Sequence, residues 1–531
     1  MVRDDACLKS RHELAIFSMQ EVGIGVDLGS TEFRVGVFDY NTDALIREAK
    51  DKVPYYVQGN GIVTQCSADI LAAVEKVFDS LQLNNYNVCS LGVGATCSML
   101  VGKQEDQDVV PFNLVPREEK CHDILFWMHS AAIEETAYLN DTIDKSILSH
   151  FGGKLFSEMA IPKLMQLCKT YTKDELIVLD LHRWLLWRLS LKLGYKETIP
   201  INVANSNGIA HDGELFGWDE KFYQTLQLNK IYIGNRNEVA HSNQFGDSCI
   251  DCYTNWFQSW SSDMLDNTLF VVAGTSTCCL YASNTFNSFI PGVWGPFRDI
   301  LINRKHNDID ENYSVYEAGI SNTGLLLEKL YETHPAVNDT DIADFLKKIE
   351  NDIQSIESRE SRSIHLLVDR MFLFETSGET GLTFVKMISG CNSKVHEDSD
   401  PIDLILRYVV LIETLAFQIA DVFNVLKLGN ANISNIVITG SQAKNVRMLN
   451  IVDAVLDKIP IGTPDIDNAT AGVRGAYRLG KAHQKDISPV SFSRNTTLRS
   501  HSTEKKFLPD IYDHLKRKYA NYKTITKTNI R

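Results

Sequence analysis

The sequence predicts an α/β protein made of two similarly built domains with a cleft between them, and three observations support this prediction. The chain has 531 residues, of which 44% are apolar, and this is enough for two hydrophobic cores, because single cores stop growing at roughly 250–300 residues. Two strand–turn–strand segments of the same design occur about half a chain apart, at 22–39 and 267–282. Later segments alternate buried-type strands with helices, which is typical of layered α/β domains.

The first of these segments has two apolar runs, rich in Val and Ile, on either side of residues 28–31, which we call the first glycine turn. Glycine lets a backbone approach a ligand closely, and the N–H groups of such a turn attract anions. Ser30 and Thr31 add hydroxyl donors, and Asp27 places a carboxylate beside them. This combination suits a polyphosphate with Mg²⁺, although the Walker pattern GxxxxGK[ST] is absent.

The second segment carries Gly-Thr-Ser-Thr at 274–277, which we call the second glycine turn. A turn of this composition by itself is usually only a hairpin turn. Two such turns, each at the head of a domain-sized stretch, indicate two domains that face one nucleotide.

The remaining chain supplies further α/β elements and suggests the domain limits. We expect a helix from about 400 to 427 that is ended by Gly429, then a buried strand that runs into a turn at Gly440. A helix at 448–456, a strand near 459 and a helix at 472–482 follow. Residues 303–363 are expected to be mostly helical, residues 488–502 form a loop, and a terminal helix starts near 510. The predicted units are an N-terminal extension (1–20), two domains (21–265 and 266–485), and a linker with a basic helix (486–531).

Charge and hydropathy exclude several function classes. The net charge of −15 and the pI of about 5.4 argue against a general nucleic-acid or membrane-surface binder. The most apolar stretch, 404–426, carries Arg407, Glu413 and Asp421, too many charges for a bilayer span. The first 20 residues lack a secretory h-region, so we expect a cytoplasmic protein, with a mitochondrial location as the alternative. The basic side chains after about 485 are interpreted as a solvated terminal helix in preference to an RNA-binding patch.

The 11 cysteines are interpreted as reduced thiols, because their number is odd and an export signal is lacking. Cys249 and Cys252 form a lone CxxC pair, and Cys278 and Cys279 are adjacent. A zinc site would need a second pair at a suitable spacing, and a thioredoxin-type motif would open a helix in a small βαβ domain. Buried thiols are the favoured interpretation.

At these motifs the chain resembles the FGGY carbohydrate kinases. Residues 25–31 look like the first phosphate loop of that family, 273–278 like the second, and 438–445 like the adenosine motif, with 471–476 as the helix start behind it. The resemblance implies two RNase H-like domains of the actin-like ATPase type, with ATP and Mg²⁺ bound between them. It implies that Asp27 holds the metal through water. It assigns nucleotide binding to Gly29, Ser30, Thr31, Arg34, Gly274, Thr275, Ser276, Gly440, Ser441 and Asn445.

Other stretches resemble the ribulokinase-like branch of the family, in a divergent member of the kind expected in fungi. They are 95–98, 127–128, 152–153, 157–159, 162–163 and 290–296, together with a Glu-Ala-Gly-Ile-Ser signature at 317–321. The substrate implied by this resemblance is a small ketose or polyol, with a ribulose-like pentulose as the nearest type. The implied substrate contacts are Thr96, Cys97, Trp127, His129, Glu158 and Lys163.

The family also places a catalytic aspartate shortly before the second phosphate loop, and Asp251 occupies that place here. A sugar hydroxyl is a poor nucleophile, and a carboxylate that accepts its proton orients it for attack on the γ-phosphorus. The plainer alternative is an aspartate that caps the start of a helix. Asp247 and then Asp212 are the next candidates for the base.

The sequence also departs from the family pattern in the sugar site. His129 and Ala131 stand where sugar-phosphorylating relatives have Asp and Arg, and Gly94 replaces an Asp. The Asn-Arg-Ser-Pro motif is not recognisable at 368–377, and bulky residues, among them Trp256, follow the candidate base. Losing hydroxyl-binding groups from a sugar site costs discrimination heavily.

Two functions therefore stay open. One is an ATP-dependent sugar kinase, favoured because Asp27, both glycine turns and Asp251 are retained. The other is a pseudokinase that binds nucleotide or metabolite as a regulator, favoured by the lost sugar contacts. A protein-directed ATPase of the actin or chaperone type fits the fold but not residues 291–296. We expect a small-molecule substrate and neither a nucleic-acid nor a membrane partner, and a homodimer is left open.

Overall fold

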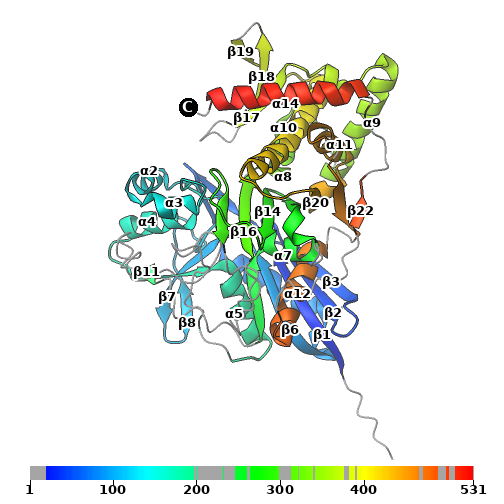
Figure 1. Ribbon diagram of the computed structural model, residues 1–531. Coiled ribbons are helices and arrows are strands. Elements are labelled where there is room, and N and C mark those ends of the chain that lie inside the picture. Colours follow the sequence, from blue (N-terminus) through cyan, green and yellow to red (C-terminus); the bar gives the residue numbers. More distant parts are fainter. Residues whose placement is uncertain are drawn as a thin grey trace, which may run out of the picture.

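The structure of the chain is a computed structural model, shown in Figure 1. It describes residues 19–196, 199, 231–232, 245–259, 264–297, 313–320, 322–338, 341–375, 382–388, 391–457, 459–465, 470–487, 498–501, 507 and 509–529. Most of the predicted N-terminal extension, Asp212, Ser321 and most of the expected loop at 488–502 lie outside these residues.

The first half of the chain is built on a five-stranded sheet. Its strands are β1 (Gln20–Leu28), β2 (Glu32–Asp39), β3 (Leu45–Lys52), β6 (Tyr86–Ala95) and β12 (Gly246–Ile250), in the order β12-β6-β1-β2-β3. The pairs β1–β2 and β2–β3 are antiparallel, whereas β6 runs parallel to both β1 and β12. Helices α1 (Ser67–Leu81) and α5 (Leu181–Lys192) contact this sheet. The predicted strand–turn–strand at 22–39 is confirmed as β1 and β2.

The second half contains a sheet with the same central topology. Its strands are β15 (Trp294–Phe297), β16 (Ser314–Ile320), β14 (Thr277–Ser283), β13 (Thr268–Ala273), β20 (Asn435–Thr439), β21 (Ile461–Pro464) and β22 (Leu498–Ser500), in that spatial order. Strands β16, β14 and β13 are antiparallel neighbours, and β20 and β21 follow in parallel with β13. Both sheets therefore share one arrangement, in which three antiparallel strands (β3-β2-β1 and β16-β14-β13) are followed by two parallel ones (β6-β12 and β20-β21). The predicted α/β class, with two RNase H-like domains, is confirmed.

A second sheet inserted into the first half carries most of the predicted sugar contacts. Its strands are β4 (Tyr56–Gly59), β5 (Ile62–Gln65), β7 (Met99–Glu105), β8 (Asp108–Pro111), β9 (Ile124–Leu125), β10 (Leu176–Asp180) and β11 (Ile231–Tyr232). Helices α2 (Ile133–Thr142), α3 (Lys145–Ser149) and α4 (Ala160–Thr170) share an apolar core with β7 and β10. Trp127 and His129 follow β9, and Lys163 lies on α4.

Helices cover the sheet of the second half of the chain, in the upper lobe of Figure 1. They are α8 (Gly324–Thr333), α9 (Ile342–Glu360), α10 (Pro401–Leu428), α11 (Val446–Val455) and α14 (Pro509–Asn529), beside a three-stranded sheet of β17 (Met371–Glu375), β18 (Leu382–Ile388) and β19 (Cys391–Lys394). The predictions for 400–427 and 448–456 are confirmed by α10 and α11. The expectation for 303–363 missed β16, where the run Val315-Tyr316 forms a buried strand between polar flanks.

Helix α10 begins and ends as its sequence indicates. The Asp400 side chain accepts a hydrogen bond from the Ile402 N–H at 2.9 Å, and Gly429 follows the last turn. Among the described helices, α10 is the one long and apolar enough to span a membrane by length and composition. Its most apolar window is 72% buried inside the protein, and its Glu413 and Arg407 have charged partners there.

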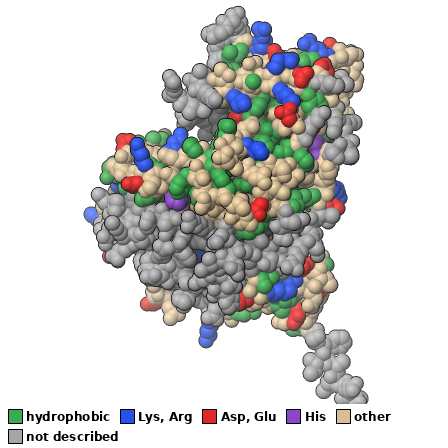
Figure 2. Space-filling view, viewed as in Figure 1, with side chains coloured by type: hydrophobic (Ala, Val, Ile, Leu, Met, Phe, Trp, Pro, Cys, Tyr) green, Lys and Arg blue, Asp and Glu red, His purple; other side chains and the backbone are tan. Residues whose placement is uncertain are grey.

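The terminal helix α14 corrects the expectation of a solvated helix. An apolar stripe on α14, spaced three or four residues apart, is at most 8% exposed and belongs to the core of the second half; its members are Ile511, Leu515, Tyr519, Tyr522 and Ile525. Lys518 lies on the same side of the helix, is 1% exposed and pairs with Glu413 of α10. The many basic residues of the tail favoured the expectation of a solvated helix, although the apolar stripe lies between them. On the face shown in Figure 2, the described acidic and basic side chains are interspersed.

Helix α12 (Ala471–Lys485), which the sequence assigns to the end of the second unit, packs on the first sheet and on α7 (Asp251–Ser259). Its backbone comes very close to the strands. A Cβ atom on Gly25 would lie 1.8 Å from the Val473 carbonyl oxygen, and one on Gly92 would lie 1.7 Å from that of Ala476. The missing side chains therefore allow a helix from the C-terminal half to complete the N-terminal domain.

Candidate active site

The first glycine turn connects β1 to β2 at the end of the first sheet. The Gly29 N–H donates to the Glu32 carbonyl oxygen at 3.0 Å and closes the turn. A Cβ atom on Gly29 would meet nothing closer than that same oxygen at 3.9 Å. A side chain at position 29 would fit within the folded chain. The open side of the turn therefore has room for a ligand.

The second glycine turn connects β13 to β14 and lies against the start of α8. The N–H groups of Thr323 and Gly324 donate to the carbonyl oxygens of Thr275 and Gly274 at 2.9 and 3.0 Å. A Cβ atom on Gly274 would have its nearest neighbour at 3.8 Å. Both turns thus leave space that a phosphate could fill, and the nearby helix N-terminus favours negative charge.

Asp27 is placed by the close packing of β1 against α12. A Cβ atom on Gly472, in the first turn of α12, would lie 2.3 Å from Asp27 Oδ2, so the carboxylate touches the helix backbone. Burial raises the pKa of Asp27 to about 6; Arg34 lowers this pKa and Glu32 raises it. Its carboxylate oxygens are the hard ligands that Mg²⁺ prefers, and they fit a Mg²⁺ site.

Arg34, the neighbour of Asp27 across the β1–β2 ladder, is paired with glutamates. Its guanidinium forms ion pairs with Glu32 and, at 3.5 Å, with Glu48. These contacts hold Arg34 along the outer strands, and its predicted contact with nucleotide stays a prediction.

Asp251 begins α7 directly after β12, and both Ile250 of β12 and Leu28 of β1 pair with Ala95 of β6, so Asp251 and Asp27 lie at the same end of the first sheet. Burial raises the pKa of Asp251 to about 7, with the negative charge of Asp27 as the next cause. The Asp251 carbonyl oxygen accepts hydrogen bonds from Thr254 Oγ1 at 2.8 Å and Asn255 Nδ2 at 2.9 Å. Asp251 therefore lies in the first turn of a helix and also brings its carboxyl group beside the candidate metal ligand. Asp247 lies one strand earlier, on β12, where its Oδ1 accepts the Ser248 N–H at 2.8 Å.

One side chain joins the predicted sugar contacts to the first glycine turn. We call these contacts the sugar wall: Thr96, Cys97, Trp127, His129, Glu158 and Lys163. Trp127 Nε1 donates to Ser30 Oγ at 3.1 Å, and the Trp127 N–H donates to Ser98 Oγ at 3.0 Å. Thr96 Oγ1 lies 2.9 Å from the same Ser98 hydroxyl. The segment that contains Thr96 and Cys97 is thereby fixed against Trp127.

Lys163 and His129 lie behind Trp127 and are both buried. Lys163 Nζ donates to the carbonyl oxygens of Phe126 and Trp127, each at 3.0 Å, and burial lowers the pKa of Lys163 to about 8. His129 Nδ1 lies 3.4 Å from the Val63 N–H, and its Nε2 lies 3.1 Å from Gln166 Oε1. Both ring nitrogens of His129 thus contact protein groups, so this residue helps to hold the sugar wall in position.

Glu158, the last predicted sugar contact, is exposed, and its Oε2 accepts the Ser157 hydroxyl at 3.2 Å. All six predicted sugar contacts stay predictions.

Two stretches that resemble ribulokinases meet across the two halves of the chain. The Gly292 N–H donates to the Gly152 carbonyl oxygen at 2.8 Å, and the Gly295 N–H donates to that of His150 at 2.8 Å. Phe151 and Trp294 form an isolated β-bridge between these bonds. The two motifs are about 140 residues apart in sequence but form one main-chain connection beside the site.

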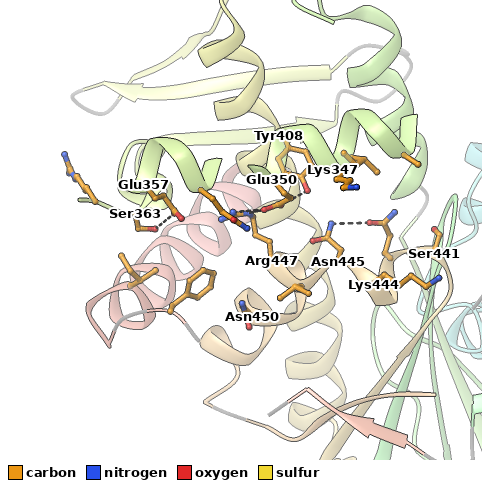
Figure 3. A pocket seen from close by; sticks show the side chains of 18 of the residues that line it. Lys347, Glu350, Glu357, Ser363, Tyr408, Ser441, Lys444, Asn445, Arg447 and Asn450 are labelled. Atoms are coloured by element: carbon orange, nitrogen blue, oxygen red, sulfur yellow. Dashed lines mark hydrogen bonds and ion pairs between the residues drawn. The ribbon is translucent and has the colours of Figure 1, made fainter. Parts of the chain in front are cut away.

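A cavity of about 1030 Å³ opens at the predicted adenosine motif in the second half (Figure 3). Ser441 and Asn445 line it, next to the turn at Gly440, whose φ is +87°. The opposite wall comes from α9. Its Glu350 accepts three hydrogen bonds from Arg447: Nε to Oε1 at 3.0 Å, Nε to Oε2 at 3.3 Å and Nη2 to Oε2 at 2.8 Å. Sequence reasoning missed the α9 wall, and the only available signal was the row of polar residues three or four apart, such as Lys347, Glu350 and Gln354.

Comparisons with known proteins agree with this arrangement. The model for "FGGY family of carbohydrate kinases, C-terminal domain" matches residues 269–480. Protein MPA43 of Saccharomyces cerevisiae is 34% identical over 507 residues, which cover 92% of this chain and 91% of that protein. D-ribulokinase YDR109C of the same yeast is 23% identical over 561 residues, which cover 93% and 76%.

Solved structures show the same fold. Gluconate kinase from Lactobacillus acidophilus superposes with a TM-score of 0.64 at 13% identity, covering 96% of this chain and 98% of that one. Glycerol kinase from Plasmodium falciparum with ADP gives 0.64 at 12% identity, covering 96% and 99%. The fold is therefore that of the two-domain sugar kinases.

The chain belongs to the FGGY family of carbohydrate kinases. The resemblance noted in the sequence, including that to the ribulokinase-like branch, is confirmed.

Proposed function

We propose that the protein is an ATP-dependent kinase that phosphorylates a small ketose or polyol, with a ribulose-like pentulose as the first candidate. The observation that carries this proposal is that two buried aspartates, Asp251 and Asp27, lie at the same end of the first sheet, beside the first glycine turn. In this arrangement, a base for the hydroxyl and a ligand for the metal stand next to a place suited to phosphate.

Both halves of the chain would bind ATP, the phosphate donor. The N–H and hydroxyl groups of the glycine turns, with Ser30 and Thr31 on one side and Thr275 and Ser276 on the other, would bind the phosphates of ATP. Mg²⁺, when bound, neutralises charge on those phosphates, and Asp27 would hold it through water. The adenosine end would lie in the cavity at Gly440, Ser441 and Asn445, and the Asn445 side chain is fixed by the Met448 N–H at 3.1 Å.

The ketose or polyol, which accepts the phosphate, would lie against the sugar wall. Trp127 would supply an apolar face, and Thr96 and Cys97 would lie beside it. Asp251 would accept the proton of the attacking hydroxyl, and a pKa near 7 suits a base that works at neutral pH. We also propose a small-molecule partner and a cytoplasmic location.

The proposal is tested with purified full-length protein and a panel of sugars and polyols, with ADP release as the readout and ATP alone as the blank. We expect at least one member of the panel to stimulate ADP release. Asp251→Asn should reduce that turnover by roughly 10²–10⁴-fold, the contribution of a general base, while ATP binding persists. Asp247→Asn is the matched control, since this carboxylate caps the Ser248 N–H on β12, and it should keep turnover within about threefold.

A pseudokinase is the second candidate, favoured by the contacts of His129. The residue that replaces a sugar-binding aspartate has both ring nitrogens beside Val63 and Gln166, so it has little capacity left for a sugar hydroxyl. If ATP binds but no compound stimulates ADP release, and Asp251→Asn changes nothing, the regulator is the correct assignment. Turnover that survives Asp251→Asn would instead show that another group is the base.

A further inference from the structure

Two cysteines and a glutamate from three separate elements meet behind the candidate base. Cys252 is the second residue of α7, Cys278 is the second residue of β14, and Glu317 lies in the middle of β16. The two sulfur atoms and a carboxylate oxygen all lie within 4.8 Å of one another. Cys252 and Glu317 are 5% and 4% exposed, and Cys278 is half-buried. Nothing in the sequence indicates that these cysteines pair, because they belong to two different motifs.

We propose that this cluster is a binding site for a soft divalent cation of the zinc class, with Cys252, Cys278 and Glu317 as its protein ligands. Zinc takes thiolate sulfur at about 2.3 Å and carboxylate oxygen at about 2.0–2.2 Å, so its ligand atoms lie roughly 3–4 Å apart. Because the ligand atoms of the cluster lie within 4.8 Å of one another, a contraction of at most about 1–2 Å closes them around the ion. Each thiol gives up its proton to solvent when it coordinates.

The carboxylate of the cluster is oriented by a neighbour. Tyr253 Oη donates a hydrogen bond to Glu317 Oε2 at 2.7 Å, and both side chains are buried. Hydrogen bonds of this kind hold a metal ligand in position, and their loss typically weakens metal binding 10–100-fold. Three protein ligands leave one tetrahedral position for water, as in open zinc sites.

A metal site explains the cluster better than a redox-active disulfide does. A disulfide would use the two sulfur atoms and give the buried carboxylate no part. Cys252 is also only 5% exposed, which keeps oxidants away from its sulfur. Mg²⁺ is a poor competitor, because it prefers oxygen ligands.

Because of its position, a bound ion would connect elements that lie far apart in the chain. Cys252 follows Asp251 directly, and Cys278 follows the last residue of the second glycine turn. An ion held by these residues fastens α7 to β14 and β16, and with them the candidate base to the candidate phosphate site. Metal binding should therefore stabilise the folded protein, since the unfolded chain cannot assemble the three ligands.

The test uses full-length protein kept reduced with a phosphine and titrated with Co²⁺ in the presence of excess Mg²⁺, followed by competition with Zn²⁺. We expect one Co²⁺ per chain, the absorption bands of a tetrahedral cobalt–thiolate complex, their loss when Zn²⁺ is added, and a higher melting temperature with Zn²⁺. These readouts do not require kinase activity, so failure of the proposed function would leave them unchanged.

The variants identify the ligands. Cys252→Ser and Cys278→Ser should each weaken Co²⁺ binding at least tenfold and reduce the thiolate bands, and Glu317→Gln should weaken binding while the bands remain. Cys89→Ser is the matched control, because Cys89 lies on β6 outside the cluster, and it should change neither affinity nor spectrum. Wild-type protein without thiolate bands, or undiminished binding in the Cys252→Ser/Cys278→Ser double variant, would overturn the proposal. The wild-type spectrum decides the question even if a variant fails to fold.

Discussion

The docking of the terminal helix includes one buried ion pair that mutagenesis can test. Lys518 of α14 and Glu413 of α10 are each 1% exposed and form an ion pair, and Lys518 Nζ also donates to the Val368 carbonyl oxygen at 2.5 Å. His365 Nδ1 lies 2.7 Å from the other oxygen of Glu413. Burial by itself raises the pKa of Glu413, but Lys518 and His365 lower it overall, so the carboxylate is charged inside the core.

Lys518→Met removes the ammonium group and keeps most of the apolar stem, so little cavity forms. What remains is a buried carboxylate without its cation, and breaking such a pair costs roughly 3–5 kcal/mol. Lys516→Met is the matched control on the same helix. Lys516 forms an ion pair with Asp457, and the side chains of Lys516 and Asp457 are 40% and 81% exposed. Exposed pairs contribute about 0–1 kcal/mol to the free energy of unfolding.

The measurement is equilibrium urea unfolding of the full-length variants, followed by far-ultraviolet circular dichroism. The double variant Lys518→Met/Glu413→Gln should recover part of the loss, since the glutamine carries no buried charge, and the cycle gives the coupling energy of the pair. If Lys518→Met costs no more than Lys516→Met, the terminal helix is not docked through this pair and the reasoning fails.

Three further predictions concern the phosphate site, the α12 contact and pH. Gly274→Val should weaken ATP binding at least tenfold, about 1.4 kcal/mol, without loss of fold, because a Cβ there meets nothing closer than 3.8 Å; equal affinity in calorimetry would refute the placement of that turn. Gly92→Ala should cost about 1–3 kcal/mol or more in urea unfolding, because its Cβ would lie 1.7 Å from the Ala476 carbonyl oxygen. Gly319→Ala is the control, because a Cβ on Gly319 would meet nothing within 4 Å. Burial lowers the pKa of His129 from 6.5 to about 4, so the unfolded chain binds the proton first and the stability that is present above pH 6.5 is lost as the pH falls toward 4. At roughly 1.4 kcal/mol per pH unit the loss is on the order of 3 kcal/mol, and a His129→Gln variant with an unchanged acid limb in its melting temperatures would contradict it.

Much of the fold could be predicted from the sequence because its signals are local. The alternation of buried and glycine positions in β1 and the repeat of a glycine turn between apolar runs are visible in short windows. Asp400 and Gly429 mark the two ends of α10, and both act within one turn of the helix. The candidate base was placed at Asp251 by the resemblance to the family, a prediction that the proposed experiment will test.

Other features depend on contacts between segments that are far apart in the chain, and only the tertiary structure decided them. Helix α12 joins the first sheet because glycines on β1 and β6 allow backbone contact, and sequence does not show which surface faces which. Lys518 became a core residue because Glu413 lies opposite it, about 100 residues away in the chain. Cys252 and Cys278 come from different motifs and meet only when α7 packs beside β14. The sequence therefore determined the elements and the chemistry that they carry, whereas the pairing of buried charges and thiols was decided by packing, since burial and proximity exist only once the layers are assembled.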